Sequence, residues 1–255
     1  MKNAELKKLL DSNYLKFNAQ GFIADDPISL PHLFSKKEDI EIIGFLVAII
    51  SWGQRISIIN NGKKLIEIFE NAPHQFITQH TDNDLKHCLK FVHRTFNDTD
   101  LLSMIGFLKE IYLKNNGLEK AFSIYITAKD KTVEKALNGF KILYENSESY
   151  IQRSSKHIAY PAAKSACKRL NMFLRWMVRK DDFGVDFGIW NSISPSQLIC
   201  PLDVHVIRTA ISYNLITTAK SDWKTAIQLT ENLKKYDKND PVKYDFALFG
   251  LGVNS

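Results

Sequence analysis

The sequence predicts an all-α protein, and two observations lead to that fold class. Apolar residues recur at the three-to-four-residue spacing of a helix along almost the whole chain, and no alternating β pattern continues for more than a few residues. The chain has 255 residues, 45% of them apolar, which is enough to bury a full core as one large domain or as two smaller lobes. It shows no internal repeat and no low-complexity tract.

The expected helices follow from this periodicity, and capping residues indicate where two of them start. Ser35 and Glu38 form a capping-box pattern ahead of the apolar run from Ile40, so a helix is expected to begin there. Asp203 precedes another helical pattern and is expected to be the N-cap of a helix over 204–213. The remaining expected helices span residues 4–17, 56–70, 84–91, 99–115, 118–127, 133–148, 164–180, 221–235 and 241–251.

Two long stretches lie outside the expected helices. Residues 19–32 contain Pro27 and Pro31, and residues 181–202 contain two glycines and two prolines. Irregular segments of about twenty residues are uncommon inside a compact domain and are usually functional. The second stretch is therefore expected to wrap a cleft.

Composition and cysteine spacing limit the classes of function. Cys88, Cys167 and Cys200 stand far apart and in no ligand spacing, so we expect free thiols, with no disulfide, zinc site or iron–sulfur cluster. The N-terminus lacks the apolar core of a signal peptide, and the longest apolar run, residues 42–52, is too short to span a bilayer. We expect a cytoplasmic monomer with no cofactor and no membrane partner.

Charge is unevenly distributed along the chain. The formal net charge is only +6, but residues 150–180 contain eight Lys or Arg and no Asp or Glu. In the expected helix 164–180, apolar side chains share one face and cations lie nearly opposite. Many charged faces are merely solvated, but like charges stacked at helical spacing repel one another unless an anion lies across them. The cations expected to contact nucleic-acid phosphates are Arg153, Lys156, Lys164, Arg169, Arg175 and Arg179, with Lys168 on the same face.

Asp203 has a structural and a functional interpretation, and the two are compatible. As an N-cap it would accept backbone N–H bonds at the positive end of a helix, which favours its charged form. A carboxylate held in this way can also act as a base or stabilise a developing cation. The basic run argues for a phosphate backbone, and the acid after the loop argues for an enzyme.

Several segments resemble the helix-hairpin-helix DNA glycosylases, the HhH-GPD superfamily. The lysine-bearing segment 168–177 leads through the long loop to Pro201-Leu-Asp-Val-His-Val206, which is similar to a Val-Asp-Thr-His-like motif of that superfamily. Residues 45–55 and 244–252 resemble its early and closing helices. The separation of Lys168 from Asp203, 35 residues, is nearer to the archaeal 8-oxoguanine glycosylase branch. From about Pro27 onward, the chain most closely resembles a bacterial family of uncharacterised function common in Bacteroidetes.

The resemblance implies a two-lobed helical fold with a cleft between the lobes, one lobe of residues 36–150 and one of residues 1–35 plus 151–255. It implies DNA repair by an N-glycosylase that flips a damaged base into a pocket and breaks the N-glycosidic bond. Asp203 would stabilise the oxocarbenium-like state. If the protein is also an AP lyase, a lysine amine attacks C1′, and Lys168 is the first choice and Lys164 the second.

The resemblance also suggests residues for the base pocket. Trp52 and Trp176 are candidates for stacking on the extruded base, although tryptophans in helical proteins are usually core residues. Gln54 is a candidate for filling the hole or bonding a base edge, with Arg55 beside it on the DNA. His205 could orient Asp203, although a helix histidine is more often only packed or solvated.

Two departures from the superfamily leave alternatives open. The hairpin signature is rich in glycine, but residues 157–164 contain none, which puts the close approach to phosphate in doubt. The four-cysteine cluster of some members is also absent, as it is in other branches. The alternatives are a catalytically inactive nucleic-acid-binding protein with the same fold, and a helical interaction protein whose basic face meets an acidic protein or a nucleotide.

Overall fold

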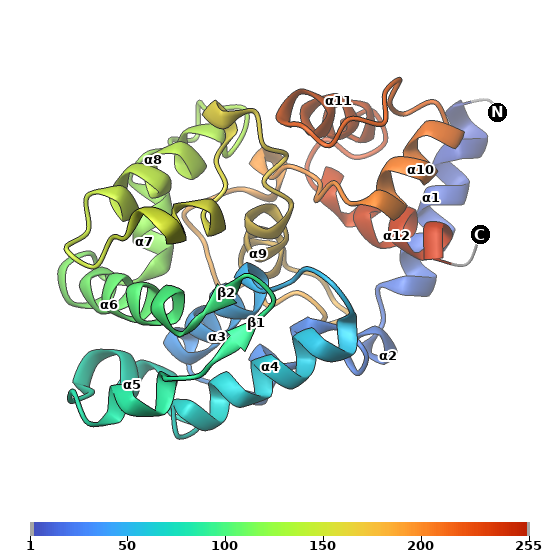
Figure 1. Cartoon of the computed structure of the whole chain (residues 1–255). Coiled ribbons are helices and arrows are strands. Elements are labelled where there is room, and N and C mark those ends of the chain that lie inside the picture. The colour runs from blue at the N-terminus through green and yellow to red at the C-terminus, as the bar shows by residue number, and fades with distance from the viewer. Residues whose placement is uncertain (1–2, 254–255) are drawn as a thin grey trace. The chain divides into compact units, whose positions relative to one another are not determined.

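The computed structural model describes residues 3–253 and is built almost entirely of helices (Figure 1). These residues form twelve α-helices, seven short 3-10 segments and one two-stranded hairpin. The all-α fold class is therefore confirmed. The chain divides into two compact units. Unit 1 holds residues 3–22, 126–135 and 160–253, and unit 2 holds residues 23–125 and 136–159.

Unit 2 is built around helix α3 (Lys37–Ile49), which packs against α4 and α5. The helix is buried from Ile40 to its end, so it is apolar on nearly all sides, as expected of a central core helix. The other elements of this unit are α4 (Arg55–Ile68), α5 (Pro73–Gln79), β1 (Val92–His93), β2 (Phe96–Asn97), α6 (Asp98–Lys114) and α7 (Leu118–Ser123). Two further helices, α2 (Gln20–Ile23) and α8 (Glu134–Glu145), cross from one unit into the other.

Unit 1 carries the basic helix and the acid that follows the long loop. Its α-helices are α1 (Asn3–Phe17), α9 (Lys168–Val178), α10 (Val204–Ser212), α11 (Trp223–Lys234) and α12 (Tyr244–Val253). Both α1 and α10 pack against α12. At Gly250 of α12 an added Cβ would lie 2.2 Å from the ring of Phe17, so the two helices approach closely there.

The structure corrects two of the predicted helix starts. Helix α3 has Lys36 as its N-cap, with no side-chain capping bond, so Ser35 lies outside the helix and the predicted capping box does not form. Helix α9 starts at Lys168 rather than Lys164. Lys164 and Cys167 have φ values of +62° and +50°, and left-handed residues cannot continue a right-handed helix.

Other differences lie in unit 2. Helix α5, which begins with Pro73 at its first turn, was not predicted. The helix expected over 84–91 is a 3-10 segment at Asp84–Cys88, followed by a hairpin in which His93 pairs with Phe96. The hairpin strands have only two residues each, which is too short for an alternating pattern to be visible in the sequence.

The units also have different boundaries from the predicted lobes. Residues 23–35 and 151–159 belong to unit 2, and residues 126–135 belong to unit 1. Among residues 3–253, no helix combines the length and the apolar character needed to cross a membrane.

Candidate functional site

Two of the predicted phosphate-binding cations are buried in unit 1. Arg175 of α9 and Arg179, the C-cap of that helix, are only 4% and 1% exposed. Arg175 forms ion pairs with Asp186 and Asp245, and its guanidinium lies 4.2 Å from the centre of the Phe246 ring. These arginines are unavailable to a phosphate backbone, and the prediction that they bind nucleic acid was wrong.

Arg179 continues the same network of alternating charges. Its guanidinium donates to Asp240 at 2.8 Å, to Asp186 at 2.9 Å and to the hydroxyl of Tyr14 at 2.6 Å, and it also pairs with Asp181. The anionic partners come from outside α9, so the charge count of residues 150–180 could not show them. Arg175 and Arg179 therefore hold unit 1 together from within.

Trp176, a predicted stacking residue, is fully buried. Its indole Nε1 has no hydrogen-bond partner among the described residues. An unpaired buried donor costs free energy of folding, which the packing of the indole in the core must offset. An indole in the core cannot stack on an extruded base, so this prediction was also wrong. The structural alternative, a core tryptophan, is the correct one.

Asp203 is the N-cap of α10, as predicted. Its Oδ1 accepts a hydrogen bond from the backbone N–H of Val206 at 2.9 Å. The side chain is partly exposed, and Oδ2 makes no hydrogen bond within residues 3–253. The capping bond fixes one oxygen and leaves the other available to a ligand.

Lys168 is the first residue of α9 and is partly exposed. Its ammonium has no carboxylate within 4 Å among the described residues. Lys164 lies outside the helix and is exposed, and its carbonyl accepts from the backbone N–H of Trp223, the first residue of α11, at 3.1 Å. Of the two lysines, Lys168 has the more enclosed environment.

Asp245 of α12 joins these groups. It is only 7% exposed, pairs with Arg175 and accepts a contact from the Cys200 thiol at 3.9 Å. Burial raises the pKa of Asp245 to about 6; the charge of Arg175 opposes this shift, Asp203 adds to it, and Lys168 opposes it. Desolvation thus outweighs the ion pair. Because Asp203 and Lys168 both act on this carboxyl, all three groups belong to one electrostatic cluster, which we call the Asp245 cluster.

The neighbouring thiol is not a nucleophile. Cys200 is fully buried, and burial together with the negative charge of Asp245 raises its pKa well above the usual value. The thiol therefore stays protonated at neutral pH. Its backbone N–H donates to the hydroxyl of Thr230 at 3.0 Å, which fixes the segment that leads to Asp203.

Two other predicted residues of unit 1, His205 and Arg169, are partly exposed. His205 Nδ1 lies 3.1 Å from the carbonyl of Gly252, so the imidazole links α10 to the end of α12. Arg169 is partly exposed, and burial lowers its pKa to about 10, which still leaves it charged at neutral pH.

The remaining predicted residues belong to unit 2. Trp52 is partly exposed and stacks on His157, with ring centroids 5.8 Å apart. Gln54 is exposed and is the N-cap of α4, and Arg55 is exposed at the first position of that helix. Gly53 precedes them with φ +98°, a value suited to glycine, and the side chain of Arg94 packs against it.

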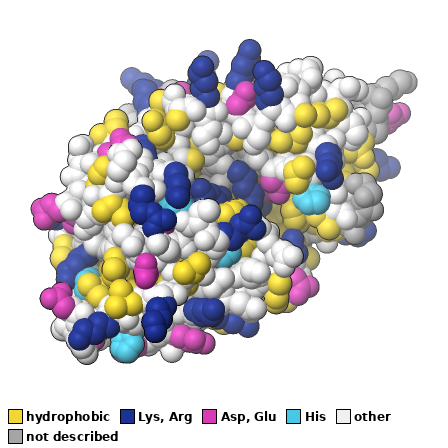
Figure 2. Space-filling view, in the orientation of Figure 1, with side chains coloured by type: hydrophobic (Ala, Val, Ile, Leu, Met, Phe, Trp, Pro, Cys, Tyr) yellow, Lys and Arg dark blue, Asp and Glu magenta, His cyan; other side chains and the backbone are white. Residues whose placement is uncertain are grey.

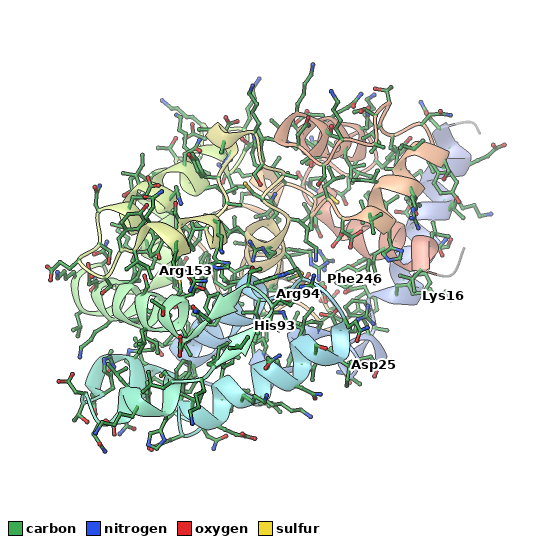
Figure 3. The ribbon with its side chains drawn as sticks, viewed as in Figure 1. Lys16, Asp25, His93, Arg94, Arg153 and Phe246 are labelled. Carbon is green, nitrogen blue, oxygen red and sulfur yellow. The ribbon has the colours of Figure 1, made fainter. Side chains whose placement is uncertain are left out.

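Arg153 and Lys156 are also exposed in unit 2. Arg153 bonds Asn97 and lies 3.4 Å from the buried carboxylate of Asp100, so one side of its guanidinium is occupied. Figure 3 shows Arg153 and the hairpin residues His93 and Arg94 on this unit.

Sequence reasoning missed Asp245, although the sequence carries a signal for it. Asp245 is the one acid in the otherwise apolar helix α12, and buried acids inside apolar helices are rare unless they are paired. No group of three or more His, Cys, Asp or Glu side chains suited to a metal ion occurs within residues 3–253.

The fold and the cluster define a helical protein in which the charges of a partly exposed lysine and a capping aspartate influence a buried acid. The chain belongs to the family described as protein of unknown function (DUF2400), whose model matches residues 26–254. No curated protein and no solved structure matches the chain.

Proposed function

We propose that the protein is a DNA N-glycosylase with the two-lobed fold of the helix-hairpin-helix glycosylases, and that it also has AP-lyase activity. One observation carries the proposal: Asp203 caps α10 with one carboxylate oxygen and keeps the other without a hydrogen bond among residues 3–253, and the partly exposed Lys168 begins α9, 35 residues earlier in the sequence. An amine and a carboxylate in one cluster are the two groups that the reaction needs.

Asp203 has the geometry for stabilising a cationic sugar. Its Oδ1 is held by the N-terminus of α10, and its Oδ2 is free within the described residues. When the N-glycosidic bond breaks, positive charge develops at C1′ and the leaving base takes the electron pair. A fixed carboxylate stabilises that charge without having to reorganise. Asp203 would also activate the attacking water or lysine.

Lys168 would supply the amine of the lyase reaction. The free amine attacks C1′ of the sugar and forms a Schiff base, and β-elimination then breaks the strand on the 3′ side. Lys164 remains the second candidate, because it is exposed and lies only four residues earlier.

Asp245 would have a supporting part in this chemistry. Its carboxyl pairs with Arg175 and lies more than 4 Å from the Lys168 ammonium, so it acts on the site through its charge and not as a direct acceptor of the lysine proton.

A second candidate function is nucleic-acid binding without chemistry. It is favoured by the segment before α9, where Pro161–Ala163 forms a 3-10 turn and no glycine brings the backbone close to a phosphate. This candidate predicts binding that weakens with salt and no turnover on any lesion.

The decisive assay uses duplexes that each carry one abasic site or one damaged base, with release of the base and strand cleavage as readouts. The wild-type protein is expected to process at least one of them, and Asp203→Asn is expected to lose at least about a hundredfold in rate, the range seen when a charge-stabilising group is removed. Asparagine is as good an N-cap as aspartate, so the fold is preserved.

Asp222→Asn is the matched control. Asp222 caps α11 as Asp203 caps α10, and its Oδ1 accepts from Thr225 N–H at 2.8 Å. The control is expected to keep full activity. Equal losses in both variants, or an unaffected Asp203→Asn, would contradict the proposed role of Asp203.

A further inference from the structure

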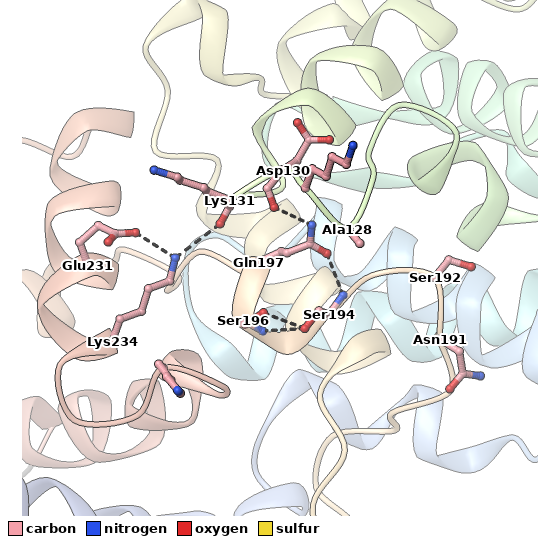
Figure 4. Close-up of a pocket in the computed structure, with 12 residues that line it drawn as sticks. Ala128, Asp130, Lys131, Asn191, Ser192, Ser194, Ser196, Gln197, Glu231 and Lys234 are labelled. Carbon is pink, nitrogen blue, oxygen red and sulfur yellow. Dashed lines mark hydrogen bonds and ion pairs between the residues drawn. The ribbon is translucent and has the colours of Figure 1, made fainter.

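A polar groove lies in unit 1, on residues that the proposed chemistry does not use. It has a volume of about 740 Å³ and is lined by three segments: residues 128–131, residues 191–197 and the last turns of α11 with the loop after it (Figure 4). Figure 2 shows Lys and Arg side chains along the upper edge of the molecule, over α11 and the loops beside it.

Eleven of the twelve residues that line the groove are polar or charged. Ala128 is its only apolar residue among the described lining, so an apolar ligand would find no complementary wall. The hydrogen-bond donors around it are lysine ammonium groups, serine hydroxyls and the two side-chain amides of Asn191 and Gln197. The lining lysines are Lys129, Lys131, Lys234 and Lys238, and the serines are Ser192, Ser194 and Ser196.

The two acids in the groove are already neutralised. Asp130 pairs with Lys135 at 2.5 Å and accepts from the backbone N–H and hydroxyl of Thr127, and these bonds lower its pKa to about 2. Glu231 pairs with Lys234 at 2.9 Å. Lys129, Lys131 and Lys238 have no carboxylate within 4 Å among residues 3–253. The groove therefore presents three unbalanced positive charges.

The floor of the groove is rigid. Gln197 is only 6% exposed; its Nε2 donates to the carbonyls of Thr127 and Asp130 at 2.9 and 2.8 Å, and its Oε1 accepts from the backbone N–H of Ser194 at 3.0 Å (Figure 4). Its own carbonyl accepts from Val133 at 2.9 Å. These bonds join two of the lining segments before any ligand arrives, which lowers the entropic cost of binding.

We propose that this groove binds the phosphodiester backbone of a nucleic-acid strand. The three cations lie on separate parts of an open groove, an arrangement that suits several consecutive phosphates of a strand. A single phosphate would instead need donors that converge on one point. No aromatic side chain lines the groove, which excludes readout of bases by stacking on its walls. The groove would supply the backbone contacts of unit 1 that the buried Arg175 and Arg179 cannot make.

The test measures binding of an undamaged, fluorescently labelled single strand by anisotropy over a range of salt concentrations. The triple variant Lys129→Ala/Lys131→Ala/Lys238→Ala is compared with Lys8→Ala/Lys220→Ala/Lys224→Ala, which removes three exposed lysines of the same unit from outside the groove. Both variants lose the same net charge. Because no base is excised, the result is independent of the proposed glycosylase chemistry.

The groove variant is expected to bind the strand at least about tenfold more weakly at low salt. Its plot of log association constant against log salt concentration is expected to be less steep by about 2, since each of the three phosphate contacts to a single strand contributes about 0.7 to the steepness. The control is expected to keep most of the affinity and the slope. Equal behaviour of the two variants would overturn the proposal. So would displacement of the strand by inorganic phosphate or a mononucleotide at the same concentration, since that result indicates a site for a single phosphate.

Discussion

The raised pKa of Asp245 predicts a specific dependence of stability on pH. The ordinary pKa of an aspartate is 3.8, and in the folded protein that of Asp245 is about 6 because the carboxyl is buried. A difference of about two pKa units corresponds to about 3 kcal/mol. Folded protein thus retains a proton that the unfolded chain has lost between about pH 4 and pH 6. In that window the contribution of Asp245 to the free energy of unfolding falls as the pH rises.

The measurement is urea unfolding of the wild type and of Asp245→Asn between pH 4 and pH 7.5. The variant cannot ionise at this position, so the wild-type free energy of unfolding is expected to fall relative to it by about 2 to 3 kcal/mol across that range. Asp130→Asn is the control: the pKa of Asp130 is lowered to about 2, so its difference from wild type is expected to be flat above pH 4. If the free energy of unfolding of the wild type, relative to that of Asp245→Asn, stayed constant or rose with pH, the result would contradict this prediction.

Two further predictions test the packing of unit 1 and the state of the thiols. Gly250→Ala is expected to destabilise the protein by about 1 to 3 kcal/mol, because the added Cβ would clash with the ring of Phe17. Gly21→Ala is the control, because a Cβ at Gly21 meets nothing within 4 Å. Equal unfolding midpoints of the two variants in urea would contradict the close approach of α1 and α12. Burial raises the pKa values of the Cys88 and Cys167 thiols to about 11 and 12. A thiol reagent at pH 7 is therefore expected to label the three buried cysteines only after unfolding. Rapid labelling of the folded protein would contradict their burial.

Local sequence patterns were sufficient for most of the helices and for Asp203. Helical periodicity is a property of neighbouring residues, so it placed α1, α6, α10 and α11 to within a few residues. The capping role of Asp203 is equally local, because the acceptor and the donor are three residues apart. A lysine and a cysteine give no sign that they will adopt positive φ, and the start of α9 was therefore placed too early.

The ion pairs of the basic residues in 150–180 depend on residues that lie far away in the sequence. Arg175 and Arg179 pair with Asp245 and Asp240, which lie 70 and 61 residues further along the chain. A local count of charge cannot distinguish a cation that awaits a phosphate from one that is neutralised by tertiary contacts. The same long-range packing buries the Asp245 carboxyl against Arg175, so the candidate site was predicted only in part.

In the proposed reaction, Lys168 and Asp203 act together on an abasic sugar. Borohydride reduction during incubation with a duplex that carries an abasic site traps any Schiff base as a covalent protein–DNA adduct. Wild type and Lys164→Ala are expected to form the adduct, and Lys168→Ala is expected to form none. An adduct of undiminished yield with Lys168→Ala, or no adduct with the wild type, would contradict the assignment of Lys168 as the nucleophile.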